Sequence, residues 1–115
     1  MNCCYNPYFH KGTALTAGAD SVEITITNPT NVSDLDYFEF VLCVNPNTVV
    51  TGDPLPYTIN VNGTAVALLN NLGIQINTNR LCPRKKYKGN YVVNGLGGAT
   101  YVILRDTPEC TRYAR

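Results

Sequence analysis

This sequence has no tryptophan and one histidine, His10. A single imidazole excludes a His-rich metal site and disfavours triad chemistry, so we expect His10 to serve at the surface or in packing. No Cys-x-x-Cys pair occurs, which disfavours a zinc site. No P-loop or Gly-x-Gly-x-x-Gly pattern is present either, and Gly95 to Gly98 lies between expected strands, where it predicts a turn. We therefore expect no catalytic residue, no cofactor and no metal.

Charge is also scarce. Charged residues make up 15% of the chain, where roughly a quarter is usual. The net charge is +1, but it is unevenly spread: residues 1–56 hold one basic and six acidic side chains, and residues 57–115 hold eight basic and two acidic ones. Either the halves face each other across one fold, or opposite faces of neighbouring subunits attract, and the sequence favours neither.

Long apolar runs are absent, so we expect no membrane span and no membrane partner. The first residues lack a basic start followed by an apolar core. We expect synthesis in a bacterial cytoplasm without a signal peptide.

Strand signals are abundant. In residues 54–69, Tyr57, Ile59 and Val61 alternate with polar residues, and Asn62-Gly63 is typical of a two-residue type I′ turn. This predicts a β-hairpin. Other alternating stretches are expected at residues 21–27, 37–44, 48–50, 74–76, 91–93 and 100–104. In the second of these, Phe38, Phe40, Leu42 and Val44 form the best candidate core stripe. No segment has sustained helical periodicity.

These patterns predict an all-β protein, a single small β-sandwich, jelly roll or barrel of seven to eight short strands. We expect an N-terminal arm at residues 1–12 and the β domain at residues 13–115. The arm carries the residues that we expect to hold the protein to its assembly: Cys3, Cys4, Tyr5, Tyr8 and Phe9. The five cysteines permit a bridge from the arm to a neighbouring subunit or reduced thiols throughout.

A basic cluster is the other candidate interface. Its members are Arg80, Arg84, Lys85, Lys86 and Lys88, followed by Tyr87 and Tyr91. Basic residues among tyrosines could bind nucleic acid, could protect an edge strand, or could bind an acidic neighbour. A pI near 7.6 is low for a nucleic-acid-binding domain, so nucleic acid ranks last of the three.

Two resemblances add to this. Residues 56–73 together with 84–91, from Pro-Tyr-Thr-Ile-Asn-Val-Asn-Gly to Arg-Lys-Lys-Tyr-Lys-Gly-Asn-Tyr, resemble small uncharacterised β-rich proteins of gut Firmicutes and their phages, which imply no known activity. The Cys3-Cys4 arm ahead of a β domain resembles the subunits of bacterial endospore appendages. That resemblance implies disulfides from the arm to other subunits of a fibre.

We therefore expect a non-enzymatic structural protein that works as many copies in an assembly. The favoured assembly is a phage virion, with the chain as a head-decoration or accessory capsid protein at the virion surface, bound to the major capsid protein or to copies of itself. The alternative is a subunit of a disulfide-linked extracellular or spore-surface filament. A carbohydrate-binding module with exposed tyrosines is a third possibility, and a small enzyme comes last.

Overall fold

The protein is a closed β-barrel in a computed structural model that describes residues 9–27, 31–45, 54–78 and 80–105. The strands are β1 (Phe9–Ala17), β2 (Val22–Ile26), β3 (Tyr37–Leu42), β4 (Tyr57–Val61), β5 (Thr64–Leu69), β6 (Lys86–Val92) and β7 (Tyr101–Leu104). A short 3₁₀ turn, η2 (Leu96–Gly98), joins β6 to β7. The all-β prediction is confirmed. Of the architectures that the sequence allows, the structure shows the barrel, whose sheet is closed. No helix in these ranges is long and apolar enough to cross a membrane.

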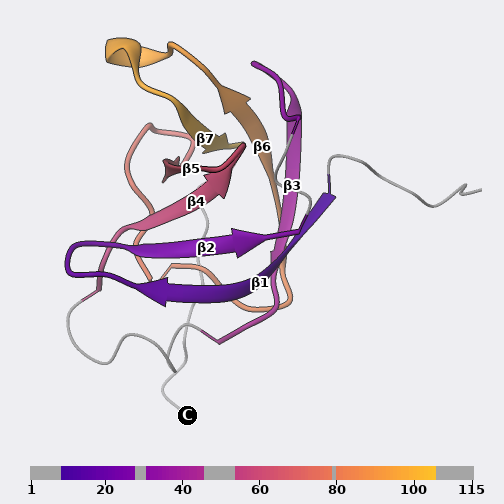
Figure 1. Ribbon diagram of the computed structural model, residues 1–115, viewed down its shortest axis with the longest axis vertical. Coiled ribbons are helices and arrows are strands. Elements are labelled where there is room, and N and C mark those ends of the chain that lie inside the picture. The colour runs from indigo at the N-terminus through magenta and orange to yellow at the C-terminus, as the bar shows by residue number, and fades with distance from the viewer. Residues whose placement is uncertain (1–8, 28–30, 46–53, 79, 106–115) are drawn as a thin grey trace, which may run out of the picture.

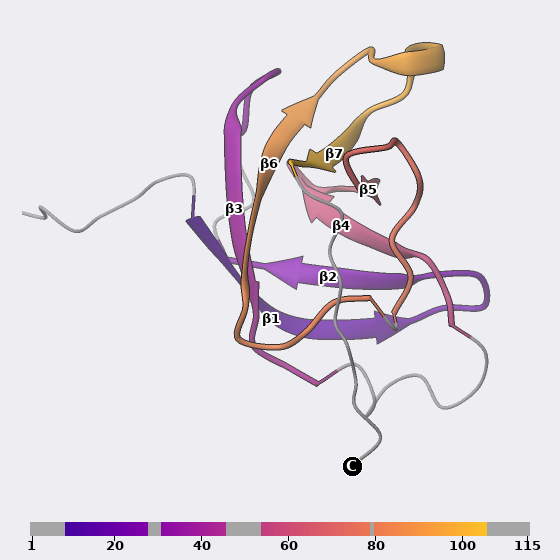
Figure 2. The ribbon, with the colours of Figure 1, turned by 180° about the vertical axis from the view of Figure 1, so that it is seen from behind.

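The barrel closes in the order β1-β2-β4-β5-β7-β6-β3, with β3 pairing back onto β1. Three neighbouring pairs are parallel, namely β1 with β3, β2 with β4, and β5 with β7. Figure 1 shows β3 and β6 running side by side, with β1 and β2 crossing below them, and Figure 2 shows the same arrangement from behind. The mixed order means that strands far apart in the sequence become neighbours.

The predicted hairpin is confirmed. Strands β4 and β5 pair antiparallel with Val61 opposite Thr64. Asn62 and Gly63 have φ angles of 56° and 84°, the left-handed values that a type I′ turn requires. The second predicted hairpin, β6 to β7, is also present, with Gly97 at φ 67° in its turn.

The core fills the barrel interior. Phe38, Phe40 and Leu42 are fully buried, as are Tyr57, Ile59 and Val61. Both predicted faces are therefore correct, because alternate residues of β3 and β4 point inward. Val44, the last residue of the predicted β3 stripe, packs partly buried against the same cluster.

Some expected boundaries are wrong. Residues 9–12 are not part of an arm: they open β1 and pair with residues 39–42 of β3. His10 is 2% exposed, stacks on Phe38 with ring centroids 4.6 Å apart, and has Nδ1 2.7 Å from the Thr27 carbonyl oxygen. Of the surface and packing roles expected for it, the structure shows packing. The structure shows only isolated bridges at Gln75 and Asn77 in place of a strand at 74–76. The expected strand at 48–50 lies outside the described residues.

Candidate functional site: the basic outer face of β1, β3 and β6

Strand register places a set of cationic side chains on one outer surface of the barrel. Phe38 and Phe40 point into the core, so their neighbours Tyr37, Glu39 and Val41 point outward. The residues directly opposite them in β1 and β6 share that direction. We call this surface the basic outer face; it consists of Phe9 and Lys11 of β1, Tyr37, Glu39 and Val41 of β3, Lys86, Lys88 and Asn90 of β6, and Arg105 after β7.

Two rows of this face carry the charge. Lys11, Val41 and Lys86 form one row across three strands. Phe9, Glu39 and Lys88 form the next, which Arg105 extends because its backbone N–H donates to the Lys88 carbonyl oxygen at 2.9 Å. Four cationic side chains thus share this surface with one carboxylate, that of Glu39.

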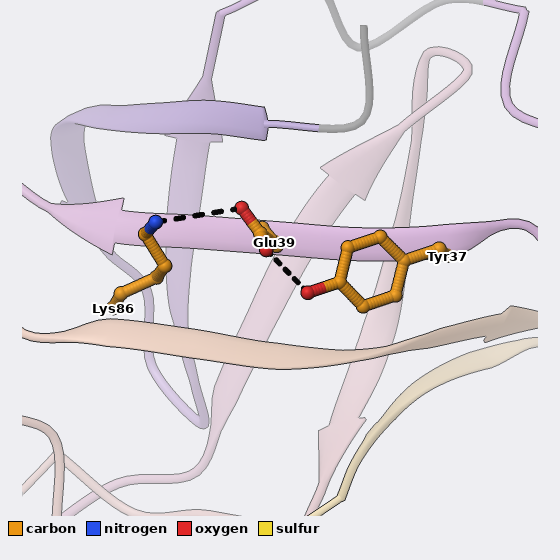
Figure 3. A network of polar contacts seen from close by, with 3 residues as sticks. All are labelled: Tyr37, Glu39 and Lys86. Atoms are coloured by element: carbon orange, nitrogen blue, oxygen red, sulfur yellow. Dashed lines mark hydrogen bonds and ion pairs between the residues drawn. The ribbon is translucent and has the colours of Figure 1, made fainter. Parts of the chain in front are cut away.

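Glu39 lies at the centre and is 7% exposed. Its Oε2 accepts a hydrogen bond from the Tyr37 hydroxyl, and its Oε1 is 3.8 Å from Lys86 Nζ (Figure 3). Burial first, and then the hydrogen bond and charge of Glu39, raise the pKa of the Tyr37 phenol. Because Lys86 is about half exposed, this ion pair adds little stability. The buried carboxylate thus contacts both the Tyr37 hydroxyl and the Lys86 ammonium.

The aromatic side chains of the face lie beneath cations. Lys86 Nζ is 5.8 Å from the centroid of the Phe9 ring, and the Arg105 guanidinium is 4.8 Å from that of Tyr37. Contacts of this kind at exposed sites contribute roughly 0.5–1 kcal/mol each. They restrict the cations to defined places on the surface.

The structure brings together only part of the predicted basic cluster. Lys86 and Lys88 lie on the outer face, because they occupy alternate positions of β6. Lys85 Nζ lies 5.8 Å from the Tyr87 ring centroid, and Arg84 and Arg80 are exposed in the segment before β6. The basic cluster is therefore divided into two sets. Lys86 and Lys88 lie on the basic outer face, and Arg80, Arg84 and Lys85 do not.

Sequence reasoning missed two of the four cations. Lys11 was assigned to the arm, and Arg105 follows the last strand. Both lie two residues from another residue of the same strand face, Lys11 from Phe9 and Arg105 from Ile103. The period-2 alternation of a strand is therefore the signal that could have placed them on the outer surface. Their place beside Lys86 and Lys88 depends on β1 and β7 lying next to β3 and β6, which the sequence does not show.

Four acidic residues of the N-terminal half make polar contacts within the fold. Val93 N donates to Asp34 Oδ1 at 2.7 Å, and Ser33 N donates to Asp36 Oδ2 at 2.8 Å. Asn60 Nδ2 donates to Glu23 Oε2 at 3.0 Å. With Glu39 engaged as well, Asp20 is the one carboxylate in the described residues with no such contact shown. The halves of opposite charge thus meet within one barrel, as the Glu39–Lys86 pair illustrates.

Most tyrosines in the described ranges are buried. Tyr87 and Tyr91, which a nucleic-acid site would need for base stacking, are 5% and 6% exposed. Tyr57 and Tyr101 are buried too, so the exposed tyrosines that favoured a carbohydrate-binding module are missing from these ranges. Tyr37 is half-buried beneath Arg105.

The cysteines differ in state. Cys43 is a free, exposed thiol, whereas a cysteine in a strand is often a small buried residue. Cys82 takes part in a disulfide, so the thiols are not all reduced. The assembly residues Cys3, Cys4, Tyr5 and Tyr8 lie outside the described residues, whereas Phe9 lies in β1 on the basic outer face.

No family model, curated protein or solved structure matches this chain. Within the described ranges, no group of three or more histidine, cysteine and acidic side chains is placed to hold a metal ion.

Proposed function

We propose that this chain is a non-enzymatic structural protein that works in many copies, docking through its basic outer face onto an acidic protein surface. The observation that carries the proposal is the set of four cations, Lys11, Lys86, Lys88 and Arg105, held on one face by strand register and by two cation–π contacts. The assembly we favour is a phage capsid, with the chain at the virion surface.

The partner is a different protein rather than another copy, at least for this face. Among the described carboxylates, Glu39 is buried, and Glu23, Asp34 and Asp36 already accept hydrogen bonds within the barrel. Complementary charge across an interface mainly speeds association and selects the partner. A major capsid protein with an acidic outer surface would supply the missing charge.

Nucleic acid is a poorer partner for the face. Its rings lie under cations or are only partly exposed, so they cannot act as open stacking platforms.

A disulfide-linked filament remains the second candidate, because of the cysteine chemistry. The thiol of Cys43 is exposed and free to bridge another subunit, and Cys82 is already oxidised. A filament of this kind should run as a ladder on a non-reducing gel, and the ladder should collapse with a reductant. A decoration protein should run as one small species under both conditions.

The direct experiment locates the protein in lysates of cells that express it. Particles are purified on a density gradient and probed with an antibody against this chain. Co-purification with DNA-filled particles, and release by high salt without reductant, is the expected result, because ion pairs at a surface are screened by salt. Recovery of the chain only in the particle-free fraction would contradict the proposal.

A further inference from the structure

Strand β1 has, in its second half, a long stretch with a described partner on one side only. Residues 9–12 pair with β3, but residues 13–17 pair with β2 alone. In the described part of the chain, nothing pairs with the other side of residues 13–17. Four of these five residues are exposed, and Leu15 is partly buried against the core.

Register shows which backbone groups this edge leaves open. Val22 N donates to Pro56 O, so the backbone groups of Val22 point toward β4 and away from β1. Those of Ile24 point the same way, because Ile24 lies two residues further along the strand. Their partners in β1 are Ala17 and Leu15. In an antiparallel ladder such residues point their N–H and C=O away from the paired strand. Leu15 and Ala17 therefore present unpaired donors and acceptors at the surface.

Within the described residues, this edge lacks the usual protection against pairing. Natural edge strands carry lysine, proline or an inward charge, or are covered. The sequence from residue 13 to residue 17 is Thr-Ala-Leu-Thr-Ala, without charge or proline. A bulge lies between Gly12 and Ala14, but it precedes the exposed stretch.

We propose that this edge, residues 13–17 of β1, pairs with the same edge of a second copy in an antiparallel two-fold contact. Leu15 of one copy then lies opposite Ala17 of the other, and the two Thr16 side chains meet at the axis, a favourable cross-strand pair. Each exposed Lys11 comes toward the partner's β1–β2 turn, which carries the exposed Asp20. Unlike charges thus meet at both ends, which favours another copy over an unrelated strand.

The contact is weak on its own. A strand pairing of this length buries far less than the roughly 1,200 Å² of a stable interface. Copies held close together on a surface would still form this contact, because their high effective concentration compensates for the weak affinity of the strand pairing. The pairing shares Lys11 with the basic outer face and rests on the proposed assembly to bring copies together, but its backbone contacts at Leu15 and Ala17 are separate from that face, so the exchange of those amides tests it separately.

Amide hydrogen exchange tests the pairing in the full-length protein at low and high concentration. We expect the amides of Leu15 and Ala17 to exchange several-fold more slowly at high concentration. Those of Ala14 and Thr16, which face β2, serve as internal controls and should not change. In mixtures of labelled and unlabelled protein, contacts between copies should involve Thr16 and its neighbours. Exchange of Leu15 and Ala17 that ignores concentration, or contacts arising from residues 1–8 of the other copy, would overturn the proposal.

Two variants sharpen the test. Ala17→Pro removes one outward N–H and should abolish the concentration dependence, whereas Ala17→Val keeps that N–H and should preserve it. If Ala17→Pro fails to fold, Thr16→Lys decides, because it places two lysines together at the axis on an exposed position. Sedimentation measures the association directly. Self-association of Thr16→Lys equal to that of the unmodified protein would overturn the two-fold pairing.

Discussion

Tyr57 places a polar group without a hydrogen-bond partner inside the barrel. Its side chain is fully buried, and its hydroxyl has no hydrogen-bond partner. A buried polar group without a partner costs about 1–3 kcal/mol. Burial, followed by the influence of Tyr87, raises the pKa of Tyr57 well above its ordinary value. Burial likewise raises the pKa of Tyr87, whose hydroxyl accepts a hydrogen bond from Cys82 N at 2.8 Å.

Tyr57→Phe should therefore be neutral or stabilising by about 1 kcal/mol, because it removes the unpaired hydroxyl and keeps the ring. The free energy of unfolding in urea measures this. Because the pKa of Tyr57 is raised in the folded state, its contribution to the unfolding free energy is fully present below pH ~10. That contribution falls as the pH rises further, since the phenol then ionises in the unfolded chain and not in the folded one. Tyr57→Phe should reduce that alkaline loss. A destabilisation of about 2 kcal/mol would instead mean that the hydroxyl is bonded.

At the scale of strands, one glycine allows β6 and β7 to pair. Gly89 lies opposite Phe38 of β3 and Leu104 of β7. A Cβ atom added there would lie 2.2 Å from the Ile103 carbonyl oxygen and 2.9 Å from its carbonyl carbon. Both are backbone atoms, so no side-chain rotation relieves the clash.

Gly89→Ala should separate β6 from β7 and lower the unfolding free energy by about 2 kcal/mol or more, the size expected of overpacking. Gly63→Ala is the matched control, because a Cβ at Gly63 meets nothing within 4 Å. Its left-handed φ of 84° should cost only about 1–2 kcal/mol. Thermal unfolding measures both, and a loss at position 89 no greater than at position 63 would contradict this account of the pairing.

Local patterns of the sequence were enough to predict single strands and hairpins. The alternation from Tyr57 to Val61 and the Asn62-Gly63 turn are local signals, and both are confirmed. Strand β1 was missed, because Thr13 to Ala17 are mostly exposed and lack apolar alternation, while His10 is a polar residue buried by stacking on Phe38. The closure of the barrel was not predictable, because its parallel contacts join segments distant in the sequence.

The candidate site was predictable only in part for the same reason. Lys86 and Lys88 stood out as part of a basic run, and their period-2 spacing places them on one face of a strand. Lys11 and Arg105 join them only through the pairing of β1 with β3 and of β6 with β7. The role of the acidic half was not predictable, because the bonds of Asp34 and Asp36 to backbone N–H groups of Val93 and Ser33 depend on the fold.

At the scale of the whole molecule, the closed barrel has an apolar interior and carries its charged side chains on the outside. Its core is apolar apart from a few buried polar groups such as His10 and Thr78. Its net charge is only +1, but the basic outer face carries four cationic side chains and one carboxylate. Such a molecule acts through its surface, and the central claim is that the basic outer face binds an acidic protein partner.

Binding to purified particles tests that claim most directly. Particles from cells that express the chain are stripped of it with high salt and mixed with purified variants. Lys11→Gln with Lys88→Gln removes two cations of the face and leaves the Glu39–Lys86 pair intact. Arg80→Gln with Arg84→Gln removes two exposed cations elsewhere and is the matched control. We expect the control to co-sediment like the unmodified protein and the face variant to bind at least about tenfold more weakly, a loss of about 1.4 kcal/mol. Equal binding by both variants, or loss of binding in the control alone, would contradict the account.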